Sequence, residues 1–347
     1  MKPFRVLVVD DSAYSRRTIS RMLDNMPQIE VVGYAGDGEE GIRQVIALKP
    51  DLVTLDLEMP RMDGFTLLRI LTTRFNLPVI VISASSEADK VFRALEMGAL
   101  DFVAKPERSN TPALNSIELD LAQKVRNVLA ARKRTLEQEP EEEPLPPPGR
   151  ILRPRRRSLE LVAIAASTGG PPALQSIFSG YDQSYPFGIV VAQHMPSGFT
   201  RAFADRLNRV SHFEVREAED GDLVQPGLAL VAPGGRNMVL QSVGIEVRAR
   251  ILPPDPEDRY LPSADRLFAS CAHIYGKRML AVVLTGMGND GKEGVVAVKE
   301  KGGLVLAESE ASAVVYGMPR EAAATGCVDR IVPLPGISQS ILDLGGF

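Results

Sequence analysis

Residues 6–12 read VLVVDDS, a short apolar run that ends in the aspartates Asp10 and Asp11. Two later apolar runs end in the same way, one at Asp56 in the sequence TLDLEMP and one at Lys105 in FVAKP. Because the carboxyl ends of parallel strands meet at one edge of a sheet, we expect these polar side chains to lie together. The pattern predicts a parallel α/β unit with a carboxylate cluster and a lysine at one edge.

The first 134 residues alternate between strand-like and helix-like segments. Runs rich in Val, Ile and Leu predict strands at 5–9, 30–35, 52–55, 79–82 and 100–103. Apolar residues at helical spacing predict helices at 12–26, 38–48, 63–75, 87–98 and 112–134. Strands that are apolar on both faces and alternate with helices are typical of a doubly wound parallel sheet, here with the flavodoxin-like order.

The composition changes abruptly after this unit. Residues 136–157 read LEQEPEEEPLPPPGRILRPRRR, with six prolines, an acidic front half and an arginine-rich back half. Few apolar residues and many prolines predict an extended linker without a core. A nucleic-acid patch is the alternative interpretation of residues 153–157, but no basic or aromatic surface accompanies them.

After the linker, strand-like and helix-like segments alternate again, which predicts a Rossmann-like doubly wound sheet. Strands are expected at 159–165, 188–192, 228–231, 279–284 and 304–307. Helices are expected at 173–178, 199–207, 263–275 and 291–301, and a hairpin is expected from 237–241 and 245–251.

Three polar residues follow strands of this second sheet. Ser167 opens STGGPP, His194 follows GIVVAQ, and Asp290 lies in the glycine loop GMGNDG. Their shared edge suggests that Ser167 attacks a carbonyl, His194 accepts its proton and Asp290 orients the imidazole. The Met287 loop is placed to supply an oxyanion N–H. The chain order differs from that of α/β-hydrolases, and no G-x-S-x-G elbow is present.

The same residues also have simpler structural interpretations. Ser167 alone could be a helix cap, and the glycine loops could bind a nucleotide phosphate, although neither fits G-x-G-x-x-G. His212 and His273, the other two histidines, are expected to be structural or solvated. Cys271 and Cys327 match no metal or redox spacing and are expected to be structural thiols in a reducing compartment.

The carboxylates of the first unit suit a metal and a phosphoryl group. Asp10, Asp11 and Asp56 offer the hard oxygen ligands that Mg²⁺ prefers. Lys105 would pair with phosphoryl oxygens, and Ser83 at the end of the fourth strand would hydrogen-bond them. The alternative is that Asp10 and Asp11 are merely helix-start acids.

This half resembles a response-regulator receiver domain across about residues 3–125. The resemblance rests on the aspartate pair, Asp56, Ser83 and the Lys105–Pro106 pair in their order along five strands. It implies phosphotransfer from a histidine of a sensor kinase to Asp56. It also gives Phe102 the position of the aromatic that reorients in such domains.

The second half resembles the catalytic domain of the chemotaxis protein-glutamate methylesterases. The segments IAASTGGPPAL, AQHMPSGFTRAFADRL, LVAPGG, PSADRLF and LTGMGNDG carry the resemblance. It implies hydrolysis of glutamate γ-methyl esters on chemoreceptors without a cofactor, and deamidation of receptor glutamines. Ser167, His194 and Asp290 fall on the family's catalytic positions, and Thr168 and Met287 fall on active-site neighbours. Two departures, Ala165 for a common Gly and Asn237 for a common His, leave substrate-groove contacts open.

We therefore expect a receiver domain at 1–125, a helix end and linker at 126–157, and a methylesterase domain at 158–347. The net charge of −4 and pI of about 5.6 argue against nucleic-acid partners. No apolar stretch approaches the ~18 residues of a membrane helix and no signal pattern begins the chain, so a cytoplasmic protein is expected. A monomer is expected as well. A DNA-binding regulator would need a basic helix-turn-helix, which we do not find, and an inactive scaffold is the other rival.

Overall fold

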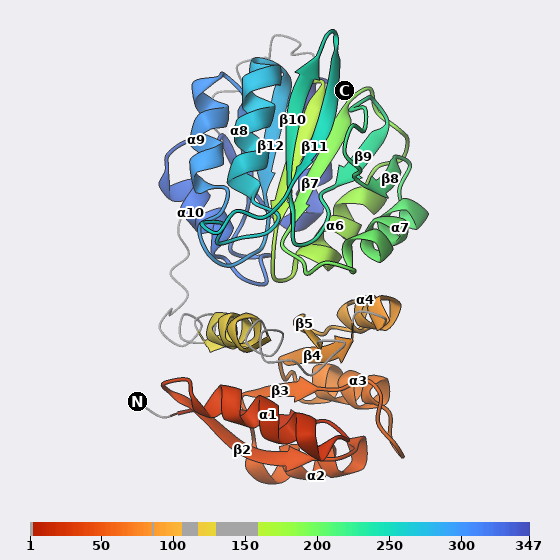
Figure 1. Cartoon of the computed structure of the whole chain (residues 1–347), viewed down its shortest axis with the longest axis vertical. Helices are drawn as coiled ribbons and strands as arrows, with labels where there is room; N and C mark the ends of the chain where they lie inside the picture. Colours follow the sequence, from red (N-terminus) through yellow and green to blue (C-terminus); the bar gives the residue numbers. More distant parts are fainter. Residues whose placement is uncertain (1–2, 85–86, 106–116, 130–158) are drawn as a thin grey trace. The chain divides into compact units, whose positions relative to one another are not determined.

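In a computed structural model of the protein, residues 3–84, 87–105, 117–129 and 159–347 are described. They form two compact α/β units (Figure 1). Most of the predicted linker at 126–157, the arginine segment at 153–157 and both ends of the predicted helix at 112–134 lie outside the described residues.

The first unit is a five-stranded parallel sheet with the predicted order β2-β1-β3-β4-β5. Its strands are β1 (Phe4–Val9), β2 (Ile29–Ala35), β3 (Leu52–Leu55), β4 (Val79–Ala84) and β5 (Asp101–Lys105). Its helices are α1 (Ala13–Asp24), α2 (Gly38–Leu48), α3 (Gly64–Arg74) and α4 (Ala88–Glu96), and residues 117–129 are also helical. The doubly wound fold expected for this half is confirmed.

Side-chain caps fix where the first three helices begin. Ser12, Asp37 and Asp63 each accept a hydrogen bond from the backbone N–H three residues later. Such caps satisfy donors that have no partner inside the helix. Because Ser12 caps α1, the helix begins at Ala13, only three residues after Asp10, which keeps the β1–α1 loop short where the carboxylates gather.

The second unit is a seven-stranded parallel sheet, ordered β14-β13-β12-β6-β7-β9-β8, with a separate antiparallel hairpin. Its strands are β6 (Leu161–Ala166), β7 (Gly188–Gln193), β8 (Glu214–Glu217), β9 (Leu228–Val231), β12 (Met279–Val283), β13 (Leu304–Glu308) and β14 (Arg330–Val332), and the hairpin is β10 (Asn237–Val243) with β11 (Glu246–Leu252). Its helices are α6 (Gly170–Ser179), α7 (Thr200–Val210), α8 (Ala264–Tyr275), α9 (Lys292–Glu300), α10 (Met318–Ala324) and α11 (Ile337–Gly345).

The strand order reverses at β6, because β7 lies on one side of it and β12 on the other. Alternate residues of these strands, such as Leu161 and Ala281, pack with buried residues of α8 and the hairpin in one apolar cluster. The residues between them, such as Val162 and Ile164, are also fully buried, as a sheet covered on both faces requires. In α/β sheets, ligands bind at the carboxyl edge beside such a reversal.

The structure adds elements that the sequence pattern did not predict. β8 and β14 are the two edge strands of the sheet, and both are short and partly exposed. Edge strands need no continuous apolar run, so periodicity gives little signal for them. Both cysteines are free thiols; Cys271 is buried and Cys327 is half-buried. None of the described helices has the length and hydropathy to cross a membrane.

Candidate active site and phosphoacceptor site

Ser167 lies directly after β6, at the turn into α6. Gly169 begins that helix with a left-handed φ of 79°, and a Cβ there would lie 2.7 Å from the Val314 side chain. Only glycine fits this turn without strain. The Ser167 N–H donates to the carbonyl of Thr285 over 3.0 Å, so the residue is tied to the neighbouring strand-end loop.

His194 lies beside Ser167 on the adjacent strand. The register pairs Ala166 with Gln193, and the His194 N–H donates to the Ala166 carbonyl over 3.0 Å. The Gln193 side-chain amide donates to the carbonyls of Ser167 and His194, each over 3.0 Å. Neighbouring strands run about 4.8 Å apart, so these bonds hold the serine and histidine backbones side by side.

Asp290 receives five hydrogen bonds and faces His194. Its Oδ2 lies 2.7 Å from His194 Nε2 and accepts the Ala264 N–H over 2.7 Å. Its Oδ1 accepts from the Ser263 hydroxyl and from the N–H groups of Asp265 and Gly291, over 3.0–3.2 Å. Asp290 is therefore bound at the N-terminus of α8, where backbone donors and the helix dipole favour a negative charge.

The ionised form of Asp290 is favoured. Burial acts to raise the pKa of Asp290, but the bond and charge of His194 and the backbone donors of α8 lower it overall. An ionised acid accepts the Nε2–H of a neutral imidazole. Nδ1 is then the ring nitrogen left to serve Ser167.

The three predicted residues are thus brought to one sheet edge, but not equally closely. His194 and Asp290 are in direct contact. Ser167 and His194 are neighbours through the backbone, and among the described residues no hydrogen bond joins the serine hydroxyl to the ring. Such contacts commonly tighten only when substrate binds.

The two predicted neighbours also reach this edge. The Thr168 carbonyl accepts the Thr285 hydroxyl over 2.9 Å. A Cβ on Gly286 would lie 2.8 Å from that of Ser167, so residues 285–287 pass directly against the serine. Within the described part of the chain, the Met287 N–H donates no hydrogen bond.

Three residues at this site were not predicted from the sequence. Tyr260 stacks on His194, with ring centroids 5.0 Å apart and planes 8° apart. Gln193 was treated only as the end of a strand. Asp265 lies beside Asp290, and its pKa is raised to about 6 by burial and by the Asp290 charge, although the Gly294 N–H acts to lower it. A serine–acid pair at a helix start resembles an ordinary cap, so Asp265 gave no distinctive signal.

Asn237, whose role the sequence left open, does not offer a free group to a substrate. Its side chain is fully buried. Its Nδ2 donates to Asp258 over 2.7 Å, and its Oδ1 accepts the Ser263 N–H over 2.8 Å. Both amide atoms are therefore used to hold the loop that leads into α8.

His212 and His273 lie outside the site, as expected. The His212 ring contacts the Tyr181 carbonyl over 2.8 Å, and His273 is exposed on α8.

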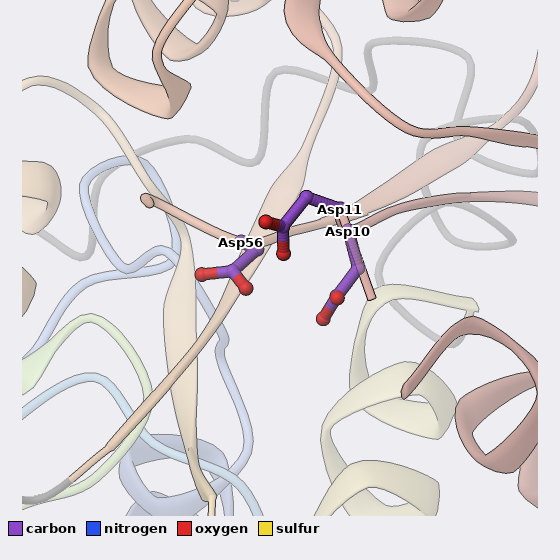
Figure 2. A group of neighbouring side chains, drawn as sticks. All are labelled: Asp10, Asp11 and Asp56. Carbon is purple, nitrogen blue, oxygen red and sulfur yellow. The ribbon is translucent and has the colours of Figure 1, made fainter. Parts of the chain in front are cut away.

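In the first unit, the three predicted carboxylates gather at the ends of β1 and β3. Oxygens of Asp10, Asp11 and Asp56 all lie within 4.8 Å of one another, and Figure 2 shows the side chains next to each other. Lys105 Nζ lies 2.5 Å from Asp56 and 3.0 Å from Asp10. Burial acts to raise the pKa of Asp56, and the net shift is upward although Lys105 opposes it.

The cluster fits a divalent metal. Mg²⁺ binds oxygens at about 2.1 Å, so ligands on opposite sides of the ion are about 4.2 Å apart. The observed spread of up to 4.8 Å needs only a small contraction to reach that distance. Asp10 and Asp56 are buried and Asp11 is exposed, which leaves an open side for water or phosphoryl oxygen.

Ser83 and Phe102 occupy the neighbouring strands β4 and β5. The buried Ser83 hydroxyl donates to the Glu87 carboxylate rather than to an oxygen of the aspartate cluster. The buried Phe102 ring packs edge-to-face on Phe92, with centroids 6.5 Å apart, and Lys124 Nζ lies 4.9 Å from its centre. Phe102 is thus in an inward position, held partly by a cation–π contact.

Taken together, the two units place the chain among regulated hydrolases of the α/β class. Residues 162–341 match the family model described as CheB methylesterase, and residues 6–113 match that of the response regulator receiver domain. The chain belongs to the CheB methylesterase family.

Relatives and a solved structure agree with this assignment. The protein-glutamate methylesterase/protein-glutamine glutaminase 3 of Geobacter sulfurreducens is 54% identical, covering 100% of this chain and 98% of that protein. The corresponding protein 1 of Myxococcus xanthus is 49% identical, covering 98% and 96%. The crystal structure of the Thermotoga maritima CheB methylesterase catalytic domain is 38% identical, with a TM-score of 0.52 over 54% of this chain and 99% of that one.

Proposed function

We propose that this protein hydrolyses γ-methyl esters of glutamate side chains on chemoreceptors, releasing methanol, and deamidates receptor glutamines, under control of phosphorylation at Asp56. The observation that carries the proposed catalysis is the 2.7 Å contact of His194 with Asp290. His194 directly follows β7, the strand that pairs with β6, and Ser167 directly follows β6. Full-length relatives at 49–54% identity bear names for the same two activities.

The reaction begins with attack by Ser167 Oγ on the ester carbonyl carbon. His194 accepts the serine proton at Nδ1 while Asp290, held ionised at the start of α8, faces Nε2 and stabilises the imidazolium. Collapse of the tetrahedral intermediate breaks the bond to the methoxy oxygen. His194 returns the proton to that oxygen, and methanol leaves.

Water completes the cycle. It attacks the acyl-enzyme carbonyl while His194 accepts one of its protons, and collapse releases the glutamate carboxylate and restores the Ser167 hydroxyl. With a glutamine substrate the first leaving group is ammonia, and the later steps are identical. The Met287 N–H, beside Ser167, is proposed as an oxyanion donor, and Thr168 as a neighbour that shapes the turn.

The receiver residues are proposed to control the rate. Asp56 accepts the phosphoryl group from the histidine of a chemotaxis kinase. Asp10, Asp11 and Asp56 would hold Mg²⁺, which when bound neutralises charge on the phosphoryl oxygens. Lys105 pairs with the same oxygens, and the Ser83 hydroxyl donates its hydrogen bond to a phosphoryl oxygen in place of the Glu87 carboxylate. The phosphoryl group adds about −1.5 to −2 charge, which changes the contacts around Phe102.

The proposed function also implies binding partners and a cellular location. The substrate is a methyl-accepting chemoreceptor, and the phosphodonor is its associated kinase. A cytoplasmic monomer without nucleic-acid partners or membrane insertion, and an esterase half that needs no cofactor, stay predictions from the sequence. Cell fractionation, light scattering and activity after chelation test them.

The decisive experiment measures methanol released from methyl-esterified receptor membranes. The full chain is assayed with and without a small phosphodonor plus Mg²⁺, beside Ser167→Ala and Asp56→Ala. Loss of a nucleophile of this kind costs about 10⁴–10⁶ in kcat, so Ser167→Ala should release no methanol above background. Asp56→Ala should keep basal release and lose stimulation. Release that survives in Ser167→Ala would overturn the catalytic assignment.

A further inference from the structure

Tyr260 covers one face of the His194 ring. The two rings are nearly parallel, and their centroids are 5.0 Å apart, which corresponds to an offset stack. Tyr260 comes from the segment between β11 and α8, residues 253–263, which carries no predicted catalytic residue. The stack restricts rotation of the imidazole about its last side-chain bond, a torsion that is otherwise broad.

The far end of the tyrosine reaches the loop of the candidate acid. Its hydroxyl donates to Asn289 Oδ1 over 3.3 Å, directly before Asp290. A Cβ on Gly288 would lie 2.2 Å from that hydroxyl, so the loop passes closely under the ring. Tyr260 therefore spans from the histidine to the segment that carries Asp290.

A buried amide fixes the segment on both sides of Tyr260. Asn237 donates to Asp258, two residues before the tyrosine, and accepts from the Ser263 N–H, three residues after it. Asp258 also accepts the Asp255 N–H over 2.8 Å and pairs with Arg266 over 2.7 Å. The loop is thus tied to β10 and to the first turn of α8.

We propose that Tyr260 is a positioning residue for His194, and that Asn237 is the buried anchor that holds Tyr260 in place. The stack keeps the imidazole plane oriented so that Nε2 remains on Asp290 and Nδ1 faces Ser167. Tyr260 acts through the histidine and not on the reacting atoms. This inference rests on the proposed esterase function and identifies a further residue of the same site.

The kinetic test compares Tyr260→Leu with Tyr260→Phe in the phosphodonor-activated full chain. Leucine removes the aromatic face, and phenylalanine keeps it without the hydroxyl. We expect Tyr260→Leu to lower kcat about 10- to 100-fold with KM unchanged, the scale of a misplaced catalytic group. Tyr260→Phe should stay within about 3-fold of the wild type. Tyr185→Leu, which removes a tyrosine from an aromatic cluster elsewhere in the unit, is the matched control.

A spectroscopic readout tests the position without relying on turnover. The chain has three histidines, so histidine-labelled protein gives three assignable sets of ring signals. The ring current of Tyr260 should shift the His194 ring protons upfield in the wild type and in Tyr260→Phe. The shift should vanish in Tyr260→Leu and weaken in Asn237→Ala. Unchanged His212 and His273 signals establish that each variant is folded.

The outcomes separate this inference from the proposed function. If the wild type releases methanol, Ser167→Ala does not, and Tyr260→Leu has wild-type kcat, the positioning role is wrong and the esterase assignment stands. A change confined to KM, or equal losses in the Leu and Phe variants, would also overturn it. If the wild type is inactive, the esterase assignment is wrong, and His194 signals that do not respond to Tyr260→Leu would overturn the stack itself.

Discussion

The backbone N–H of Asp265 donates to the carboxylate of Asp290 over 3.0 Å, so the acid that faces His194 is bound by the first turn of α8. The backbone N–H groups at the start of α8 thus hold the carboxylate of the candidate catalytic acid in place. The carboxyl of Asp265 lies next to this charge; burial and the Asp290 charge raise the pKa of Asp265 to about 6, whereas the pKa of Asp290 is lowered.

Replacing Asp290 by asparagine should nearly abolish turnover. The amide keeps the shape of the side chain but removes the charge that stabilises the imidazolium, and its NH₂ opposes the backbone donors of α8. We expect kcat to fall by about 10⁴-fold. Methanol release by the activated full chain measures this, with the exposed Asp205→Asn as control. Wild-type kcat in Asp290→Asn would remove Asp290 from the mechanism.

Replacing Asp265 by asparagine should stabilise the second unit at neutral and alkaline pH. The pKa of Asp265 is raised from 3.8 to about 6, so between these values the folded chain holds a proton that the unfolded chain has released. Stability therefore falls as pH rises through this window and stays lower above it. The shift corresponds to about 3 kcal/mol, which we reduce to about 1 kcal/mol for solvent screening.

Calorimetry of the full chain at several pH values tests this sign. The unfolding transition of the second unit should occur at higher temperature in Asp265→Asn than in the wild type at pH 8. The two should converge below about pH 3, where this carboxyl is protonated in both the folded and the unfolded wild type. If the unfolding temperature of Asp265→Asn exceeded that of the wild type by more at low pH than at pH 8, the raised pKa of Asp265 would be wrong.

Replacing Lys105 by alanine should make the first unit depend on Mg²⁺. Its Nζ lies against Asp10 and Asp56, and without it the three neighbouring carboxylates have no paired cation among the described residues. Loss of one partner of a largely buried pair costs about 3 kcal/mol. In EDTA, the first unit of Lys105→Ala should therefore unfold at a lower temperature than that of the wild type. Added Mg²⁺ should raise the unfolding temperature of this unit more in Lys105→Ala than in the wild type.

The matched control for this prediction is Arg43→Ala, which removes one exposed positive charge from the same unit. It should respond to Mg²⁺ as the wild type does. An equal Mg²⁺ effect in Lys105→Ala and the wild type would argue against metal binding by the cluster.

A fragment of residues 151–347 should be more active than the unmodified full chain. Because a phosphorylatable unit is joined to a catalytic unit by a proline-rich linker, we predict that the unmodified receiver suppresses the esterase activity. Basal methanol release by the fragment should then exceed that of the full chain and be insensitive to phosphodonor. Equal basal rates would refute suppression by the receiver.

Strand-end chemistry was readable from the sequence because it depends on local patterns. Ser167, His194 and Asp290 each follow an apolar run, and parallel topology brings such ends together. The stack of Tyr260 on His194 could not be predicted in this way. It depends on how a proline-rich loop folds back over another strand end, which no periodicity encodes. The burial of Asn237 likewise depends on contacts with Asp258 and Ser263, which follow it by more than twenty residues.

The backbone bonds from Ser167 to Thr285 and from His194 to Ala166 continue the central sheet one residue beyond its strands. Amide protons at both positions should therefore exchange with solvent only when the middle of the sheet opens, and more slowly than those of β8 or β14. The backbones of Ser167 and His194 should then unfold only together with the central strands. The backbone of such a site is fixed by the sheet, and the approach of the Ser167 hydroxyl to the His194 ring is left to substrate binding.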